Sequence, residues 1–107
     1  MKKEIYATSI KDKKEFDRAG YHYTCVRADD RRHIYLYKMT DGSSRPTELY
    51  ELVKAVKHKN PDGNVVYRYP TSEEWGLYGW TIWGYPETCK LKIEEKWSNL
   101  VPSTPKI

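Results

Sequence analysis

The scarcity of aliphatic side chains is the feature that most constrains what this chain can fold into. Leu, Ile, Val and Phe together contribute 19 of the 107 residues, about 18%, a composition close to that of disordered chains. Ten Tyr and four Trp offset this shortage, because each buried aromatic ring removes roughly 150–250 Å² from water. We therefore expect an ordered protein with an aromatic-rich core and further Tyr side chains on its surface.

The length of the chain suits one domain, since cores of this size rarely divide in two. We expect a single α+β domain over residues 1–100 and a flexible tail over residues 101–107. No apolar run reaches the roughly 18 residues of a membrane span, and no apolar stretch follows the basic N-terminus as a secretory signal would require. The sequence thus predicts a cytoplasmic protein without membrane contact, in which Cys25 and Cys89 are free thiols.

Two helices are predicted, one near each end of the chain. The first covers about residues 10–19, with Ser9 as its N-cap and Gly20 just beyond its C-terminus. The second begins with Pro86 in its first turn, where the fixed φ of proline is favourable, and continues to about Ser98. Its packing face repeats every four residues, at Cys89, Ile93 and Trp97.

Strands are predicted where β-branched and aromatic residues cluster between polar turns. In residues 33–39, aliphatic Ile34 and Leu36 alternate with aromatic and polar neighbours, which predicts one aliphatic and one aromatic face. The fold class is therefore α+β, with an antiparallel sheet of about five strands between the two helices. The predicted strands are residues 21–28, 33–39, 50–58, 64–69 and 80–83.

Residues 47–59 support two interpretations. Apolar residues in this stretch recur at i, i+3, i+4 and i+7, which favours a helix. The turn sequence at residues 60–63 precedes an apolar run over residues 64–69, which favours a hairpin with a strand on each side. We interpret residues 50–58 as the first strand of that hairpin. The apolar residues with the helical spacing are Leu49, Leu52, Val53 and Val56.

The residues after this hairpin resemble a pattern found in small uncharacterised proteins of phages and mobile elements, with the order Pro, Glu, (Phe/Trp)-Gly-x-x-(Ala/Gly)-Trp-Thr. The matching residues are Pro70, Glu74, Trp75-Gly76 and Tyr78-Gly79-Trp80-Thr81. The opening Tyr50-Glu51-Leu52-Val53 is similar to the strand that precedes the pattern in that family. The resemblance covers about half of the chain. It implies a strand at residues 50–58 and a mobile-element setting, but no agreed activity.

Catalytic chemistry has little support in the sequence. The three histidines, His22, His33 and His58, have no metal-binding partner at ligand spacing, no Ser or Cys has a local base, and no phosphate-binding loop is present. We therefore predict a protein that is not an enzyme and has no metal or cofactor. Trp75, Trp80 and Trp83 are interpreted as core anchors. One alternative is a small metal-independent ribonuclease toxin, with Arg32, His33, Tyr35 and Arg68 around the phosphodiester.

Binding is the favoured function, because cations and rings alternate on the predicted strands and the net charge is +4. Tyr, Trp and Arg dominate protein interfaces, so one hypothesis is docking on a host protein or ribonucleoprotein. The phage-like resemblance then implies an anti-CRISPR-like inhibitor of a host nuclease or its guide-RNA complex. The alternative is a sheet that binds single-stranded RNA or DNA, with rings stacked on bases and cations on phosphates. The candidate binding residues are Arg27, Arg31, Arg32, His33, Tyr35, Tyr37, Lys38, Tyr67 and Arg68.

Overall fold

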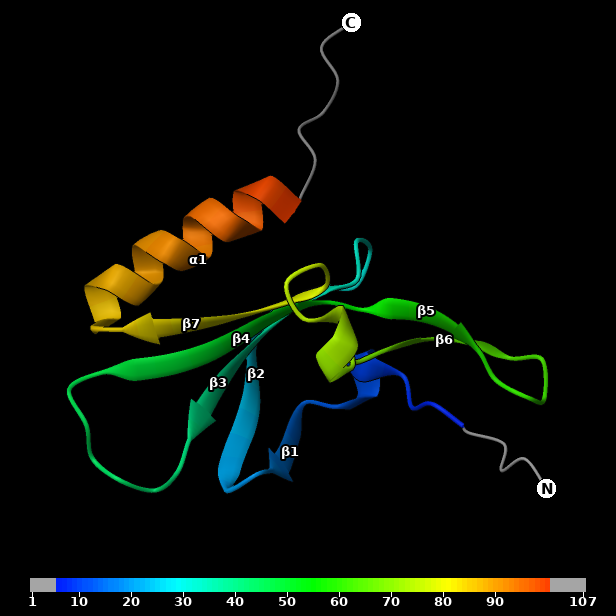
Figure 1. Ribbon diagram of the computed structural model, residues 1–107, viewed down its shortest axis with the longest axis horizontal. Coiled ribbons are helices and arrows are strands. Elements are labelled where there is room, and N and C mark those ends of the chain that lie inside the picture. The colour runs from blue at the N-terminus through cyan, green and yellow to red at the C-terminus, as the bar shows by residue number, and fades with distance from the viewer. Residues whose placement is uncertain (1–5, 101–107) are drawn as a thin grey trace, which may run out of the picture.

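The computed structural model describes residues 6–100, and its main element is a five-stranded antiparallel sheet with the strand order β1-β2-β3-β4-β7 (Figure 1). Its strands are β1 (Glu15–Arg18), β2 (Tyr21–Asp29), β3 (Ile34–Thr40), β4 (Glu48–Lys54) and β7 (Gly79–Gly84). The other elements are a two-stranded sheet of β5 (Val56–Lys59) and β6 (Val65–Arg68), the 3-10 turns η1 (Ile10–Asp12) and η2 (Ser72–Glu74), and the helix α1 (Pro86–Leu100). The predicted α+β class and C-terminal helix are confirmed, whereas the predicted tail at 101–107 lies outside the described residues.

The predicted N-terminal helix is wrong. Only residues 10–12 form a short 3-10 turn, and the chain then enters β1, which pairs with β2. The loop between them is Ala19-Gly20, with φ values of 54° and 84°, and two positive φ angles are what a type I′ hairpin turn needs. Gly20 therefore marks a hairpin turn rather than the end of a helix. Extended geometry also places the Phe16 ring against Tyr23, with the two ring centroids 4.5 Å apart.

The ambiguous stretch is extended, as the hairpin interpretation predicted, but it contributes to two sheets. It divides at Ala55, whose N–H donates to the carbonyl oxygen of His33 at 2.7 Å. β4 pairs with β3 on one side and with β7 on the other, while β5 forms the expected hairpin with β6. The helical spacing in this stretch therefore does not reflect a helix.

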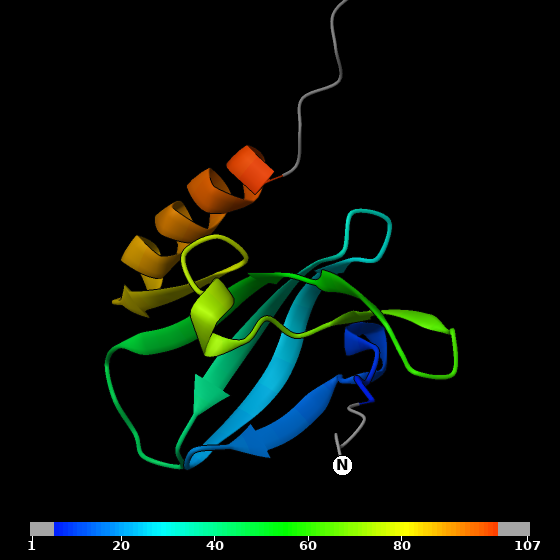
Figure 2. The same cartoon turned by 45° about the vertical axis from the view of Figure 1, so that its right-hand side comes forward.

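Both faces of the large sheet are covered. The helix α1 lies along one face, where Ile34, Leu36 and Leu52 pack with the helix residues Ile93 and Trp97. The segment from β6 through η2 crosses the other face (Figure 2). That second core is aromatic, as the alternation in β3 predicted. It contains Ile10, Tyr23, Tyr35, Tyr37, Met39, Val53 and Ala55.

No helix within residues 6–100 combines the length and the apolar character needed to cross a bilayer. The two thiols are not bonded to each other. Cys25 belongs to the aromatic core and Cys89 to the core beneath α1, so the sheet lies between them.

Candidate functional site

Four of the cations predicted to bind a partner are held by carboxylates of the same chain. Arg27 Nη1 lies 2.6 Å from Glu94 Oε1, and its guanidinium lies 4.1 Å from the centre of the Trp97 ring. The other three pairs are Arg32–Asp29 at 3.2 Å, Lys38–Glu48 at 3.0 Å and Arg68–Glu74 at 2.7 Å. Arg31 is exposed and forms no ion pair with any residue between 6 and 100. A phosphate group would have to displace a carboxylate at four of these five cations.

Two of the predicted rings lie inside the protein. Tyr35 is 3% exposed and Tyr37 is fully buried. Their hydroxyls donate to the Asp30 carboxylate at 2.8 Å and to the Lys13 carbonyl at 2.7 Å. Burial raises the pKa of both phenols, and Asp30 adds to the effect on Tyr35. In this structure neither ring is available to stack on a base.

The remaining two predicted residues, His33 and Tyr67, do come together. Their rings stack with centroids 3.5 Å apart and planes 6° from parallel. They line a cleft of about 380 Å³ together with Tyr35, Lys11 and Asp30. His33 also has a φ of 59°, which is uncommon for a residue with a side chain. Neither arginine considered for the ribonuclease alternative lines this cleft.

A buried carboxylate at the edge of the aromatic core was not anticipated. Glu51 is 8% exposed and accepts hydrogen bonds from Arg18 Nη2 at 3.1 Å and from the Tyr23 hydroxyl at 3.2 Å. The Tyr69 hydroxyl donates to the same carboxylate, and burial together with Glu51 raises the pKa of Tyr69. Both carboxylate oxygens have protein donors, so the arrangement satisfies a buried charge. The signal in the sequence was an acid set directly between Tyr50 and Leu52 in a predicted strand.

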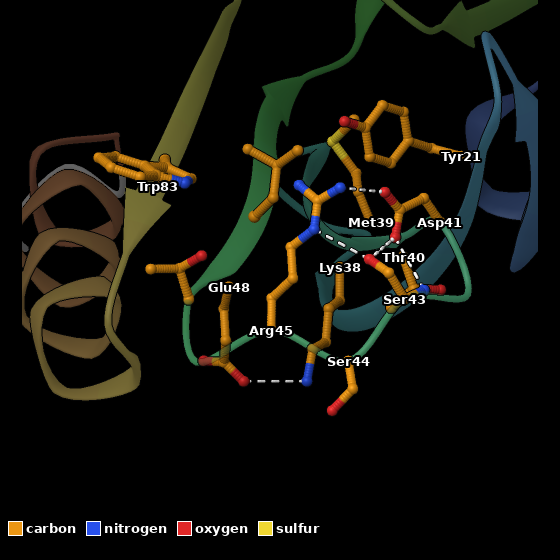
Figure 3. A pocket seen from close by; sticks show the side chains of 12 residues that line it. Tyr21, Lys38, Met39, Thr40, Asp41, Ser43, Ser44, Arg45, Glu48 and Trp83 are labelled. Carbon is orange, nitrogen blue, oxygen red and sulfur yellow. Dashed lines mark hydrogen bonds and ion pairs between the residues drawn. The ribbon is translucent and has the colours of Figure 1, made fainter.

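A cleft of about 350 Å³ opens beside the loop between β3 and β4 (Figure 3). Its charged side chains neutralise one another: Arg45 binds Asp41 at 2.8 Å and Lys38 binds Glu48. Figure 3 shows Trp83 on the β7 side of this cleft, apart from the other labelled side chains. The charged side chains of the cleft therefore pair with one another. The strand β7, which borders the cleft, is the more unusual feature.

The two edges of the large sheet differ sharply in charge. The edge strand β1 carries Glu15, Asp17 and Arg18 in four residues. The edge strand β7 lies within the run 76–86, which contains no charged residue. Proteins normally protect exposed edge strands with charges, prolines or bulges, because the unpaired backbone groups can bind another strand. β7 lacks such protection.

Part of the β7 backbone points away from the sheet. The N–H of Lys54 donates to the carbonyl of Tyr78 at 2.7 Å, and antiparallel pairs exchange hydrogen bonds at every second residue. The backbone N–H and carbonyl groups of Trp80 and Ile82 therefore point toward β4, and those of Thr81 and Trp83 point outward. On this outer side, the carbonyl of Gly79 accepts a hydrogen bond from the N–H of Gly76. From Trp80 onward, no strand within residues 6–100 pairs with the outer side of β7.

The aromatic residues around this edge are only partly in the core, so the interpretation of Trp83 as a core anchor is wrong. Trp83 and Tyr85 are each 62% exposed. Trp75 and Trp80 are half-buried. Trp75 packs so closely against Gly79 that a Cβ at that position would clash with its ring. The open edge therefore has exposed aromatic side chains beside its free backbone groups, and the run of uncharged residues was the sequence signal for it.

The fold and this site define a small α+β protein with one charged sheet edge and one open, aromatic sheet edge. Comparison with protein-family models, with curated proteins and with solved structures gave no match. Among residues 6–100, no three His, Cys, Asp or Glu side chains gather as ligands for a metal ion.

Proposed function

We propose that this chain is a non-enzymatic binding protein that docks on another protein through the edge of β7. The observation that carries the proposal is the contrast between the two edges. β1 is charged, whereas β7 is uncharged, carries the exposed Trp83 and, within residues 6–100, has no strand on its outer side beyond Gly79. Strand addition at an open sheet edge is a common mode of peptide recognition. Exposed aromatic residues such as Trp and Tyr supply much of the binding energy at protein interfaces.

The narrower form of the proposal concerns the partner and the setting. The resemblance to phage and mobile-element proteins supports a counter-defence role in the cytoplasm of a bacterial host. The partner would then be a host nuclease or its guide-RNA complex, and docking would inhibit it. This form rests on the resemblance alone, whereas the choice of surface rests on the structure.

The sheet-based nucleic-acid alternative has weaker support. Four of its cations are engaged by carboxylates, and Tyr35 and Tyr37 are buried. The ribonuclease alternative retains only the cleft that holds His33 and Tyr67. Incubating the purified protein with mixed RNA and EDTA tests that alternative directly, since cleavage would contradict a non-enzymatic role.

Site-specific photo-crosslinking tests the proposed surface. A photoreactive amino acid replaces Trp83 at the open edge or, as a matched control, Asp17 at the charged edge, and the protein is irradiated inside host cells. We expect a discrete crosslinked protein from position 83 and none from position 17. Crosslinks only from position 17, or none from position 83, would overturn the proposal. Nuclease treatment after lysis separates a crosslinked protein from one that RNA merely tethers.

A further inference from the structure

We infer that the open edge of β7 receives an extended strand of the partner in which acidic and apolar side chains alternate. This inference rests on the proposed function and adds the chemistry of the segment that binds. Its first basis is the backbone: Thr81 and Trp83 each present one N–H and one carbonyl outward, the spacing that an added antiparallel or parallel strand can pair with.

The second basis is a cationic flank beside that edge. The helix α1 returns along β7, with Thr88 packed near Gly84 and Lys96 Nζ 4.3 Å from the centre of the Trp80 ring. Lys92 lies one turn before Lys96 and therefore on the same flank of the helix, level with the middle of the strand. Neither lysine forms an ion pair with an acid in the described part of the chain.

The acids of the helix lie elsewhere. Glu94 is on the opposite flank, where it binds Arg27 at 2.6 Å. Helical spacing places Glu87 on that opposite flank as well and Glu95 on the outward side. Glu95 stands three residues after Lys92 but forms no ion pair with it, so within residues 6–100 no acid pairs with Lys92 or Lys96 beside the edge.

The third basis is the alternation of side chains along a strand. A residue of the added strand that lies opposite Trp80 or Ile82 points to the side of α1 and meets the two lysines. A residue opposite Thr81 or Trp83 points to the other face and meets the exposed indole of Trp83. Cross-strand neighbours of opposite charge, and apolar neighbours on an aromatic ring, stabilise such a pair. Acidic and apolar residues in alternation match both faces.

A second copy of this chain matches less well. Two β7 strands paired antiparallel about a twofold axis would place α1 of both copies on the same side of the joint sheet. Lys92 and Lys96 of one copy would then face the same lysines of the other, and like charges across a strand pair are destabilising. The charge at this edge therefore favours an acidic partner over self-association.

Synthetic peptides test the inference. The probes are a short capped peptide that alternates glutamate and valine, the same peptide with lysine in place of glutamate, and a glutamate–valine peptide N-methylated on the backbone groups that would face β7. Binding is measured by fluorescence anisotropy at low salt. We expect the glutamate–valine peptide to bind at least about tenfold more tightly than either of the others, because only it offers both the charge and the free N–H groups.

Two sets of variants locate the binding. Thr81→Pro removes an N–H that points away from β4 and should abolish peptide binding, whereas Thr81→Val removes only the hydroxyl that accepts from Trp75 Nε1 and should retain it. Lys92→Glu combined with Lys96→Glu should reverse the preference towards the lysine–valine peptide. Lys90→Glu, on the opposite flank of the helix, should leave it unchanged.

The outcomes separate this inference from the proposed function. Equal binding of the acidic and basic peptides, lost in Thr81→Pro, would overturn the acidic alternation while the docking edge stands. Absence of peptide binding, together with a crosslinked partner from position 83, would overturn strand addition alone. Sedimentation of the protein as a dimer that Thr81→Pro dissociates would assign the edge to a second copy and would also overturn the inference.

Discussion

At the scale of single residues, most of the charges that the sequence offered as binding groups have partners within the fold. Arg27 and Glu94 are separated by 67 positions in sequence, and Lys38 and Glu48 by 10. Pairs of this kind depend on how β2, β3, β4 and α1 are placed, so no local pattern reveals them. The residue types were predictable, but the engagement of Arg27 and Lys38 within the fold was not. The exposure of Trp83 was not predictable either, because an uncharged run of this kind also fits a buried strand.

Glu51 provides a prediction at this scale. Replacing it with alanine leaves the hydroxyls of Tyr23 and Tyr69 without their acceptor and removes the partner of Arg18. Unpaired buried polar groups are costly, so Glu51→Ala should lower the free energy of unfolding by about 2–4 kcal/mol. Urea unfolding followed by tryptophan fluorescence measures this change.

Two further variants show whether the loss of stability in Glu51→Ala comes from the missing hydrogen bonds. Glu51→Gln retains the shape and one oxygen acceptor, so its loss of stability should be smaller than that of Glu51→Ala. Glu95→Ala removes an exposed glutamate of α1 and should change stability by less than about 0.5 kcal/mol. If Glu51→Ala unfolds at the same urea concentration as the unmodified protein, the hydrogen bonds to this carboxylate contribute nothing to stability.

At the scale of elements, the sequence predicted those whose signals are local and missed those that tertiary pairing decides. The helix that begins at Pro86 has its own packing face, and the β5–β6 hairpin has its own turn at residues 60–63. β4 differs, because it is buried on both faces: Leu52 packs under α1 while Val53 packs in the aromatic core. A strand buried on both sides loses the alternation that identifies strands, which is why its apolar residues could imitate a helical spacing.

The prediction of an N-terminal helix failed for a related reason. Residues 10–19 are rich in charges that suit a helix surface, and Ser9 and Gly20 have the residue types of helix caps. Gly20 serves instead in a two-residue hairpin loop with Ala19, where both residues have positive φ. Pairing with β2 and burial of the Phe16 ring outweigh weak local helix preference.

The link between β6 and η2 gives a prediction for pH dependence. Arg68 binds both oxygens of Glu74, and these hydrogen bonds lower the pKa of Glu74 from its ordinary value of 4.5 to about 2. A carboxylate with a depressed pKa stabilises the fold above its unfolded pKa, and that contribution is lost as the pH falls through its folded pKa. The stability that this pair supplies should therefore decline between about pH 4.5 and pH 2.

Thermal unfolding of the protein and of Glu74→Gln across this range measures the effect. The melting temperature of the unmodified protein should fall more steeply with decreasing pH than that of the variant, and the two curves should converge near pH 2. Glu73→Gln is the matched control, because Glu73 forms no ion pair within residues 6–100. Parallel curves for the protein and Glu74→Gln would show that the ion pair does not contribute to stability in solution.

At the scale of the whole molecule, one sheet separates two cores of different composition. The core beneath α1 is largely aliphatic, and the core beneath β6 and η2 is aromatic. This division explains how a chain with few aliphatic residues can still fold, since aromatic rings make up much of one layer. It also places the open edge of β7 between the two layers, so that both α1 and the aromatic layer contribute to the surface on which a partner strand would lie.

The neighbouring residues Leu52 and Val53 test whether the two cores are one cooperative unit. Both are fully buried, and their side chains point to opposite faces of β4. Leu52→Ala should lower the free energy of unfolding by about 2–4 kcal/mol and Val53→Ala by about 1–3 kcal/mol. Because β4 contributes Leu52 to one core and Val53 to the other, amide hydrogen exchange in Leu52→Ala should accelerate in β6 as well as in α1. The exposed control Leu91→Ala should accelerate neither. Faster exchange confined to α1 in Leu52→Ala would mean that the aromatic layer folds independently of the helix layer. The β7 edge would then lie between two separately stable units rather than on one rigid sheet.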